Sequence, residues 1–175
     1  MSAPTKPTSP ECAYVLGDDG LATWSESHAD AWIGLLETHK RLTRALDAEL
    51  ESQYGLTISA LEALGRLAAA PGRSLRLSAL ASGCGLSLSR ISRIVDALQA
   101  RGLVERQAVE ADARAVEGHL TEAGLELVRC AQKAHFEAVQ RTFFEQLSED
   151  EIATLASVFS RFAPQAAGEC SASDR

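Results

Sequence analysis

The sequence predicts a mainly α-helical protein that also contains a small β-ribbon. Apolar residues recur at three- and four-residue steps through most of the 175-residue chain, a spacing typical of amphipathic helices. Two short segments, 103–106 and 116–120, break this pattern and favour strands. The length corresponds to about one domain of roughly 100–200 residues. An apolar content of 46% is enough for a packed core and excludes a wholly disordered chain.

The first two helices are predicted from their stripes and their end signals. A stripe of mostly leucines over 25–54 predicts a long helix, and Gly55 is placed as its C-terminal cap. A second helix is predicted to begin near Thr57, where Ser59 and Glu62 have the spacing of a capping box.

The centre of the chain has the pattern of two helices joined by a glycine-containing turn. A short helix is predicted over 77–82, the turn over 83–85, and a second helix over 88–101 with Ser87 as its N-cap. On a helical wheel, one side of this second helix is apolar and the other carries hydroxyl and guanidinium groups, which can bond to phosphates and base edges. The expected inward residues are Leu88, Ile91, Val95 and Leu98, and the expected outward residues are Ser89, Arg90, Arg93, Asp96 and Ala97.

A β-ribbon follows, with a polar loop predicted over 107–115 between its strands. Arg114 in that loop can reach a DNA minor groove, and Asp112 can orient a nearby arginine. Two helices joined by a turn and followed by such a ribbon form a winged helix-turn-helix. A plain hairpin loop with a local ion pair is the alternative for the ribbon tip. Thr121 is predicted to open a fifth helix, and a capping box at Ser148 a sixth.

Charge is distributed unevenly along the chain. The net charge is −7, but residues 66–114 hold eight arginines and four acidic residues, so this segment carries +4 and the remainder −11. A basic centre between acidic flanks favours one nucleic-acid-binding face on an acidic body. An ordinary solvated surface is the alternative that charge alone leaves open.

These motifs resemble the multiple antibiotic resistance regulators of bacteria, the MarR family. The elements stand in the family's order and spacing over residues 30–163. The resemblance rests on LSALA at 77–81, LSLSRISRIVDAL at 86–98, RGLVER at 101–106, DAR at 112–114 and LTEAG at 120–124.

The resemblance implies a homodimeric winged-helix transcription factor, usually a repressor of nearby genes that a small molecule or an oxidant releases from DNA. Two-fold symmetry places two recognition helices on a palindromic operator. The wing departs from the family pattern, because Ala113 stands where a basic residue is usual. By position, the DNA contacts fall on Ser87, Ser89, Arg90, Ser92, Arg93, Asp112 and Arg114.

The same resemblance implies a small aromatic ligand, often anionic. Trp32 and His39 lie on one face of the first helix, and Gln132 and His135 interrupt an apolar stripe of the fifth. A mostly apolar cleft with a few directed polar groups is the usual composition of a ligand pocket. The alternative is that Trp32 packs in a dimer interface and the histidines are core residues.

The predicted organisation follows from these elements. A flexible N-terminal extension is expected over 1–24, dimerisation helices over 25–54 and 121–163, the winged helix-turn-helix over 55–120, and a disordered tail over 164–175.

Other functions are less favoured by the sequence. The four histidines are scattered with no nucleophile–base pair, so catalysis and a cofactor are not expected. A metal-responsive regulator remains an alternative through Cys12, His28 and His39, and a cysteine-based redox sensor through Cys12. Cys84 and Cys130 are expected to be small buried hydrophobes. No signal peptide or membrane segment is predicted, so a cytoplasmic location is expected.

Overall fold

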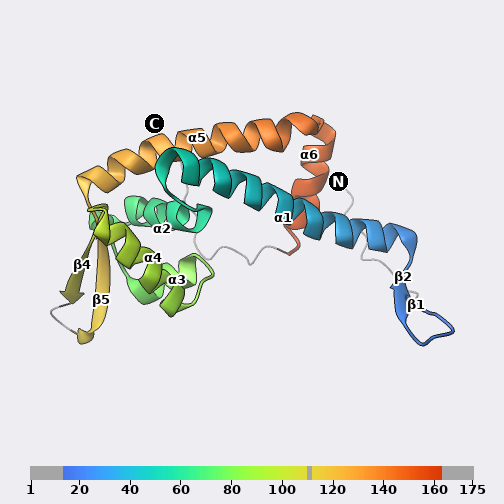
Figure 1. Cartoon of the computed structure of the whole chain (residues 1–175), viewed down its shortest axis with the longest axis horizontal. Helices are drawn as coiled ribbons and strands as arrows, with labels where there is room; N and C mark the ends of the chain where they lie inside the picture. Colours follow the sequence, from blue (N-terminus) through green and yellow to red (C-terminus); the bar gives the residue numbers. More distant parts are fainter. Residues whose placement is uncertain (1–13, 110–111, 163–175) are drawn as a thin grey trace, which may run out of the picture.

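Two long helices run along the upper part of the molecule in the view of Figure 1, and a lobe of shorter elements lies below one end of them. The computed structural model describes residues 14–109 and 112–162. The long helices are α1 (Glu26–Tyr54) and α5 (Glu122–Thr142). After the 3-10 turn η2 (Phe144–Gln146), α6 (Glu149–Phe159) folds back beneath the end of α5.

The lobe contains the predicted helix-turn-helix and ribbon. Its sheet is antiparallel in the order β3-β5-β4, with Leu75 opposite Gly118 and Arg106 opposite the same glycine on the other side. The mainly α fold with a small β-sheet is therefore confirmed. The elements of the lobe are α2 (Ile58–Ala69), η1 (Pro71–Arg73), β3 (Ser74–Arg76), α3 (Leu77–Gly83), α4 (Leu88–Ala100), β4 (Val104–Val109) and β5 (Asp112–Leu120).

The helices end at the capping residues that the sequence predicts, except at the start of α2. Gly55 ends α1 in the left-handed conformation with φ 61°, as predicted. The cap of α2 is Thr57, whose hydroxyl accepts from the Ala60 N–H, so the predicted capping box at Ser59 and Glu62 is wrong. Ser59 lies inside the first turn of α2, where its hydroxyl cannot serve as the N-cap.

The strands extend beyond the predicted runs. Most of the expected loop over 107–115 is strand, because antiparallel pairing continues from Gln107–Glu117 to a register shift between Ala108 and Val109. The edge strand β3 was not predicted at all.

The N-terminal segment also differs from its prediction. Residues 14–24 lie in the expected flexible extension, but they form a hairpin of β1 (Tyr14–Leu16) and β2 (Ala22–Trp24). The Tyr14 and Trp24 rings meet edge to face across its open end. The predicted tail over 164–175 lies outside the described residues.

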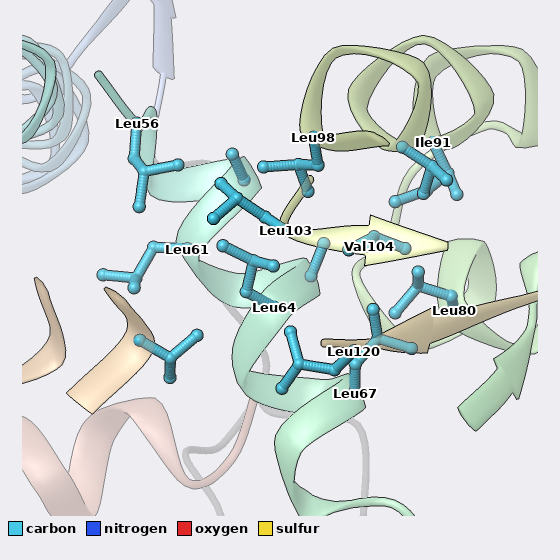
Figure 2. Close-up of a cluster of buried hydrophobic side chains, with 14 of the residues drawn as sticks. Leu56, Leu61, Leu64, Leu67, Leu80, Ile91, Leu98, Leu103, Val104 and Leu120 are labelled. Carbon is cyan, nitrogen blue, oxygen red and sulfur yellow. The ribbon is translucent and has the colours of Figure 1, made fainter. Parts of the chain in front are cut away.

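A leucine-rich core fills the lobe (Figure 2). Leu64, Leu67 and Leu80 are fully buried, and so are Ile91 and Val95 of α4. Leu88 is the exception to the predicted inward face, because it begins the helix at the edge of the core and is 54% exposed. The labelled side chains in the close-up are Leu56, Leu61, Leu64, Leu67, Leu80, Ile91, Leu98, Leu103, Val104 and Leu120.

One glycine fixes the junction between the ribbon and α5. Gly124 is buried in the first turn of α5, and a Cβ there would lie 2.7 Å from Leu120 Cδ1 and closer still to the Leu103 carbonyl oxygen. That carbonyl accepts hydrogen bonds from the N–H and the hydroxyl of Thr121. The approach of helix to strand therefore requires glycine at this position.

Candidate nucleic-acid interface

Helix α4 presents the polar face that the sequence predicts. The Ser87 hydroxyl caps the helix by accepting from the Arg90 N–H, so α4 begins as predicted. Burial of Ile91, Val95 and Leu98 holds one side of α4 in the core. The side chains on the opposite side, Ser89, Arg90, Arg93, Asp96 and Ala97, are exposed.

Most arginines of the basic segment are bound to other groups of the protein. Arg66, Arg73 and Arg106 form ion pairs with carboxylates at 2.9, 2.6 and 2.7 Å, and Arg76 lies 4.0 Å from one. Arg101 donates to backbone carbonyls instead.

Arg90 and Arg93 are different. Neither guanidinium meets a carboxylate among the described residues, and Arg93 makes only a long 3.4 Å contact to the Ser89 carbonyl. An arginine without an acidic partner retains its full capacity to bind a phosphate or a guanine edge. The free positive charge of the described interface is thus concentrated on the outer face of α4.

Ser92 occupies a different environment from its neighbours. It is half-buried, and Arg106 Nη2 from strand β4 donates to its carbonyl at 3.0 Å and to its hydroxyl at 2.8 Å. The same nitrogen lies 2.7 Å from Asp96 Oδ1, one turn further along α4. No sequence signal indicates this contact, because Arg106 and Ser92 are 14 residues apart and share no helical or strand period.

The C-terminal end of α4 is tied to the end of α1. Arg101 follows the last residue of α4, and its two terminal nitrogens donate to the carbonyls of Tyr54 and Gly55 at 2.7 Å each. The carbonyls at a helix end have no partner inside the helix, so a guanidinium placed there caps it and complements the helix dipole. This long-range link was also missed in the sequence.

The wing is the β4–β5 ribbon. Asp112 begins β5 and Arg114 is its third residue, which places both at the far end of the ribbon from α5. Their side chains lie outside the described part of the structure, so their predicted roles stay predictions.

The four candidate ligand residues do not meet within one chain. Gln132 and His135 line a groove of about 430 Å³ between α2 and α5, together with Ile58, Leu61 and Phe136. The buried Nδ1 of His135 has no hydrogen-bond partner among the described residues.

Trp32 and His39 are exposed on the first half of α1 and line no part of this groove. Helix α1 contacts α5 near Leu46 and Leu50. At 1.5 Å per residue, Trp32 lies about 21 Å along the helix from Leu46.

The surroundings of Cys84 disfavour its thiolate form. Burial is the main cause that raises the pKa of Cys84 above its ordinary value, and the Glu62 carboxylate adds to it. Cys130 is exposed, contrary to the expectation that it is buried. Cys12 lies outside the described residues. Within 14–109 and 112–162 no group of three His, Cys, Asp or Glu side chains is placed to hold a metal ion, and no helix is long and apolar enough to cross a membrane.

The family model and the solved structures that this chain matches agree with each other. Residues 54–115, which contain the whole helix-turn-helix, match the model of the MarR family. A comparison with curated protein sequences finds no match.

Solved structures resemble most of the chain. AbsC, a MarR family transcriptional regulator from Streptomyces coelicolor, is 29% identical with a TM-score of 0.73, over 80% of this chain and 94% of AbsC. Sco3205, a MarR family transcriptional regulator of the same organism solved in complex with DNA, is 27% identical with a TM-score of 0.74, over 80% of this chain and 88% of Sco3205. MarR from E. coli, at 22% identity and a TM-score of 0.63 over 74% of this chain and 94% of MarR, shares the fold. The winged lobe with its outward arginines, the family match over residues 54–115 and these structures together show that the chain contains a MarR-type winged helix-turn-helix, the fold of a DNA-binding transcriptional regulator.

Proposed function

We propose that the protein is a homodimeric repressor of nearby genes, which binds a palindromic operator and leaves it when a small aromatic ligand binds. The observation that carries the DNA-binding part is the exposure of Arg90 and Arg93 on α4 without an acidic partner among the described residues. In this proposal α4 enters the major groove of DNA.

The side chains proposed to contact DNA differ in their exposure and in whether they are already hydrogen-bonded within the protein. Ser87 and Ser89 are exposed at the N-terminal end of α4, where hydroxyls and backbone N–H groups favour phosphate. Arg90 and Arg93 follow within one turn and can read guanine or bind phosphate. Arg114 is proposed to enter the adjacent minor groove, with Asp112 orienting it. Ser92 keeps a hydrogen-bond partner within the protein.

A homodimer is proposed because the ends of the chain expose large apolar side chains. The first half of α1 has its large apolar residues uncovered by its own chain, including Trp32 at 52% exposure, and Phe162 beyond α6 is 77% exposed. Monomeric proteins rarely leave many large apolar side chains of one surface in water. A second copy related by a two-fold axis covers it and supplies the second recognition helix that a palindromic operator needs. Light scattering at micromolar concentration tests this part, and a stable monomer contradicts it.

The ligand site is proposed at the groove between α2 and α5. Its lining is mainly apolar, and Gln132 and His135 supply directed polar groups, which is the usual make-up of a small-molecule pocket. A single pocket that also contains Trp32 and His39 requires the second copy, because these residues lie far along α1 from the groove. The ligand acts by preferring a spacing of recognition helices that does not fit the operator.

The DNA-binding proposal is tested with the promoter DNA that flanks the protein's own coding region. Fluorescence anisotropy measures the affinity of wild type and of Arg90→Ala/Arg93→Ala at several salt concentrations. Each lost phosphate contact lowers the slope of log K against log salt by about 0.9, and each lost base contact costs about 1–3 kcal/mol.

The matched control removes two positive charges elsewhere. Arg129 and Lys133 are exposed on α5, outside the proposed interface, so Arg129→Ala/Lys133→Ala changes the net charge equally. We expect the control to bind almost as wild type does. Equal affinity of wild type and the Arg90/Arg93 variant would show that α4 is not the recognition helix.

A further inference from the structure

We propose that Arg106 is a positioning residue for DNA binding, which holds the recognition helix α4 in a fixed orientation against the wing. This inference rests on the proposed role of α4 at the DNA. It assigns Ser92 to the same internal contact, in place of the DNA contact that the family resemblance implies.

The geometry of Arg106 supports an internal role. From β4, its Nη2 donates to the Ser92 carbonyl and hydroxyl and pairs with Asp96 Oδ1, within 2.7–3.0 Å. Ser92 and Asp96 are four residues apart and lie on one side of α4, so a single guanidinium bonds to two successive turns. Bonds of an ionised donor to a carboxylate are stronger than neutral ones.

Burial separates Arg106 from the arginines that face solvent. Its side chain is 26% exposed, and its Nε is buried with no hydrogen-bond partner among the described residues. A phosphate approaching from solvent cannot reach that nitrogen. Nη2 is already shared among three oxygens of α4.

The ion pair with Arg106 also explains why a helix that is proposed to face DNA can carry an acidic residue, Asp96. Asp96 is 62% exposed on the outer side of α4, where an unpaired carboxylate would repel phosphates. The ion pair with Arg106 neutralises it. Ser92 contributes the remaining acceptors, which place the guanidinium between the two turns.

The test compares Arg106→Lys with Arg93→Ala in operator binding at several salt concentrations. Lysine keeps the charge but lacks the planar group that bonds several acceptors at once. We expect Arg106→Lys to lower the affinity about tenfold, the size of coupling seen for residues in one network. We expect its salt slope to equal that of wild type. Arg93→Ala is expected to lower the slope by about 1.8 if each of two protomers loses one phosphate contact.

A double-mutant cycle gives a second readout at the same site. Asp96→Asn is measured alone and combined with Arg106→Gln. If Arg106 neutralises Asp96, then Asp96→Asn improves binding far more in the absence of Arg106 than in its presence. Thermal unfolding of each variant shows that it is folded at the temperature of the assay, and the cycle decides the question if Arg106→Lys alone is not folded.

Three outcomes would overturn the proposal: wild-type affinity in Arg106→Lys, a loss of salt slope as large as that of Arg93→Ala, or equal effects of Asp96→Asn in both backgrounds. Failure of the proposed function can be distinguished from failure of this inference about Arg106. In that case Arg93→Ala also binds as wild type does, so α4 itself does not contact the operator.

Discussion

Substitution of Gly124 by alanine should destabilise the protein, although alanine is the better helix former. Alanine in place of glycine favours a helix by about 1 kcal/mol. At Gly124, however, the new Cβ would lie 2.7 Å from Leu120 Cδ1, 3.1 Å from the Leu103 carbonyl carbon and closer still to its oxygen. The Leu103 carbonyl is backbone that Thr121 already holds by two hydrogen bonds, so it cannot move aside cheaply. Overpacking costs about 1–3 kcal/mol, and the obstacle here puts the cost at the upper end, which leaves a net loss of about 2 kcal/mol.

Gly65→Ala is the matched control within α2. A Cβ at Gly65 meets only the Gln132 side-chain nitrogen at 3.0 Å, the free end of a flexible side chain. We expect Gly65→Ala to leave stability unchanged or to raise it by up to about 1 kcal/mol. Urea unfolding followed by circular dichroism, at one protomer concentration, measures both variants. For a chain of this size the loss in Gly124→Ala corresponds to a melting temperature lower by about 4–8 °C. A Gly124→Ala protein as stable as wild type would refute the reasoning from close approach.

Three further predictions concern a cap, an acidic side chain and the ligand site. Thr57→Ala should cost about 1 kcal/mol of unfolding free energy because it removes the N-cap of α2, whereas Ser59→Ala should cost less than half of that in the same urea titration. Hydrogen bonds from Ser148 lower the pKa of Glu151 below its ordinary value. Its stabilisation of α6 is therefore fully present above about pH 5 and is lost as the pH falls through the lowered pKa. Melting curves from about pH 6 to about pH 3 should be less pH-dependent in Glu151→Gln, and an unchanged profile contradicts this role. Aromatic acids that release the operator should quench tryptophan fluorescence, and a folded, DNA-binding Trp32→Ala that is released as readily as wild type would eliminate Trp32 from the ligand site.

The helices were predictable because their signals are local. The stripe of α1 and the caps at Gly55, Ser87 and Ser148 lie within a few residues of the turns that they control. Even there, the choice between Thr57 and Ser59 as the cap of α2 depends on where the chain leaves α1, since the Asp47 side chain accepts from the Ile58 N–H eleven residues away. The spacing of possible capping residues along the sequence does not reveal this hydrogen bond.

The strands and the links between elements depend on pairing across distance. Polar residues such as Gln107 join β4 only because Glu117 of β5 lies opposite, and β3 joins the sheet across more than forty residues. The outward arginines were predicted correctly from the wheel of α4. The inward bond from Arg106 to Ser92 was not, because no period relates a strand residue to a helix residue.

The bonds of Arg101 to the end of α1 have a mechanical consequence for the proposed dimer. Helix α1 has 29 residues and is therefore about 44 Å long. If its first half is held in the proposed dimer interface, the remaining half is about 22 Å long, and a tilt of that half by about 5° would move its far end by about 2 Å. Because Arg101 joins this end to the end of α4, the recognition helix would move with it. In the proposed dimer, small changes of angle near Trp32 would thereby become ångström-scale changes in the distance between the two recognition helices.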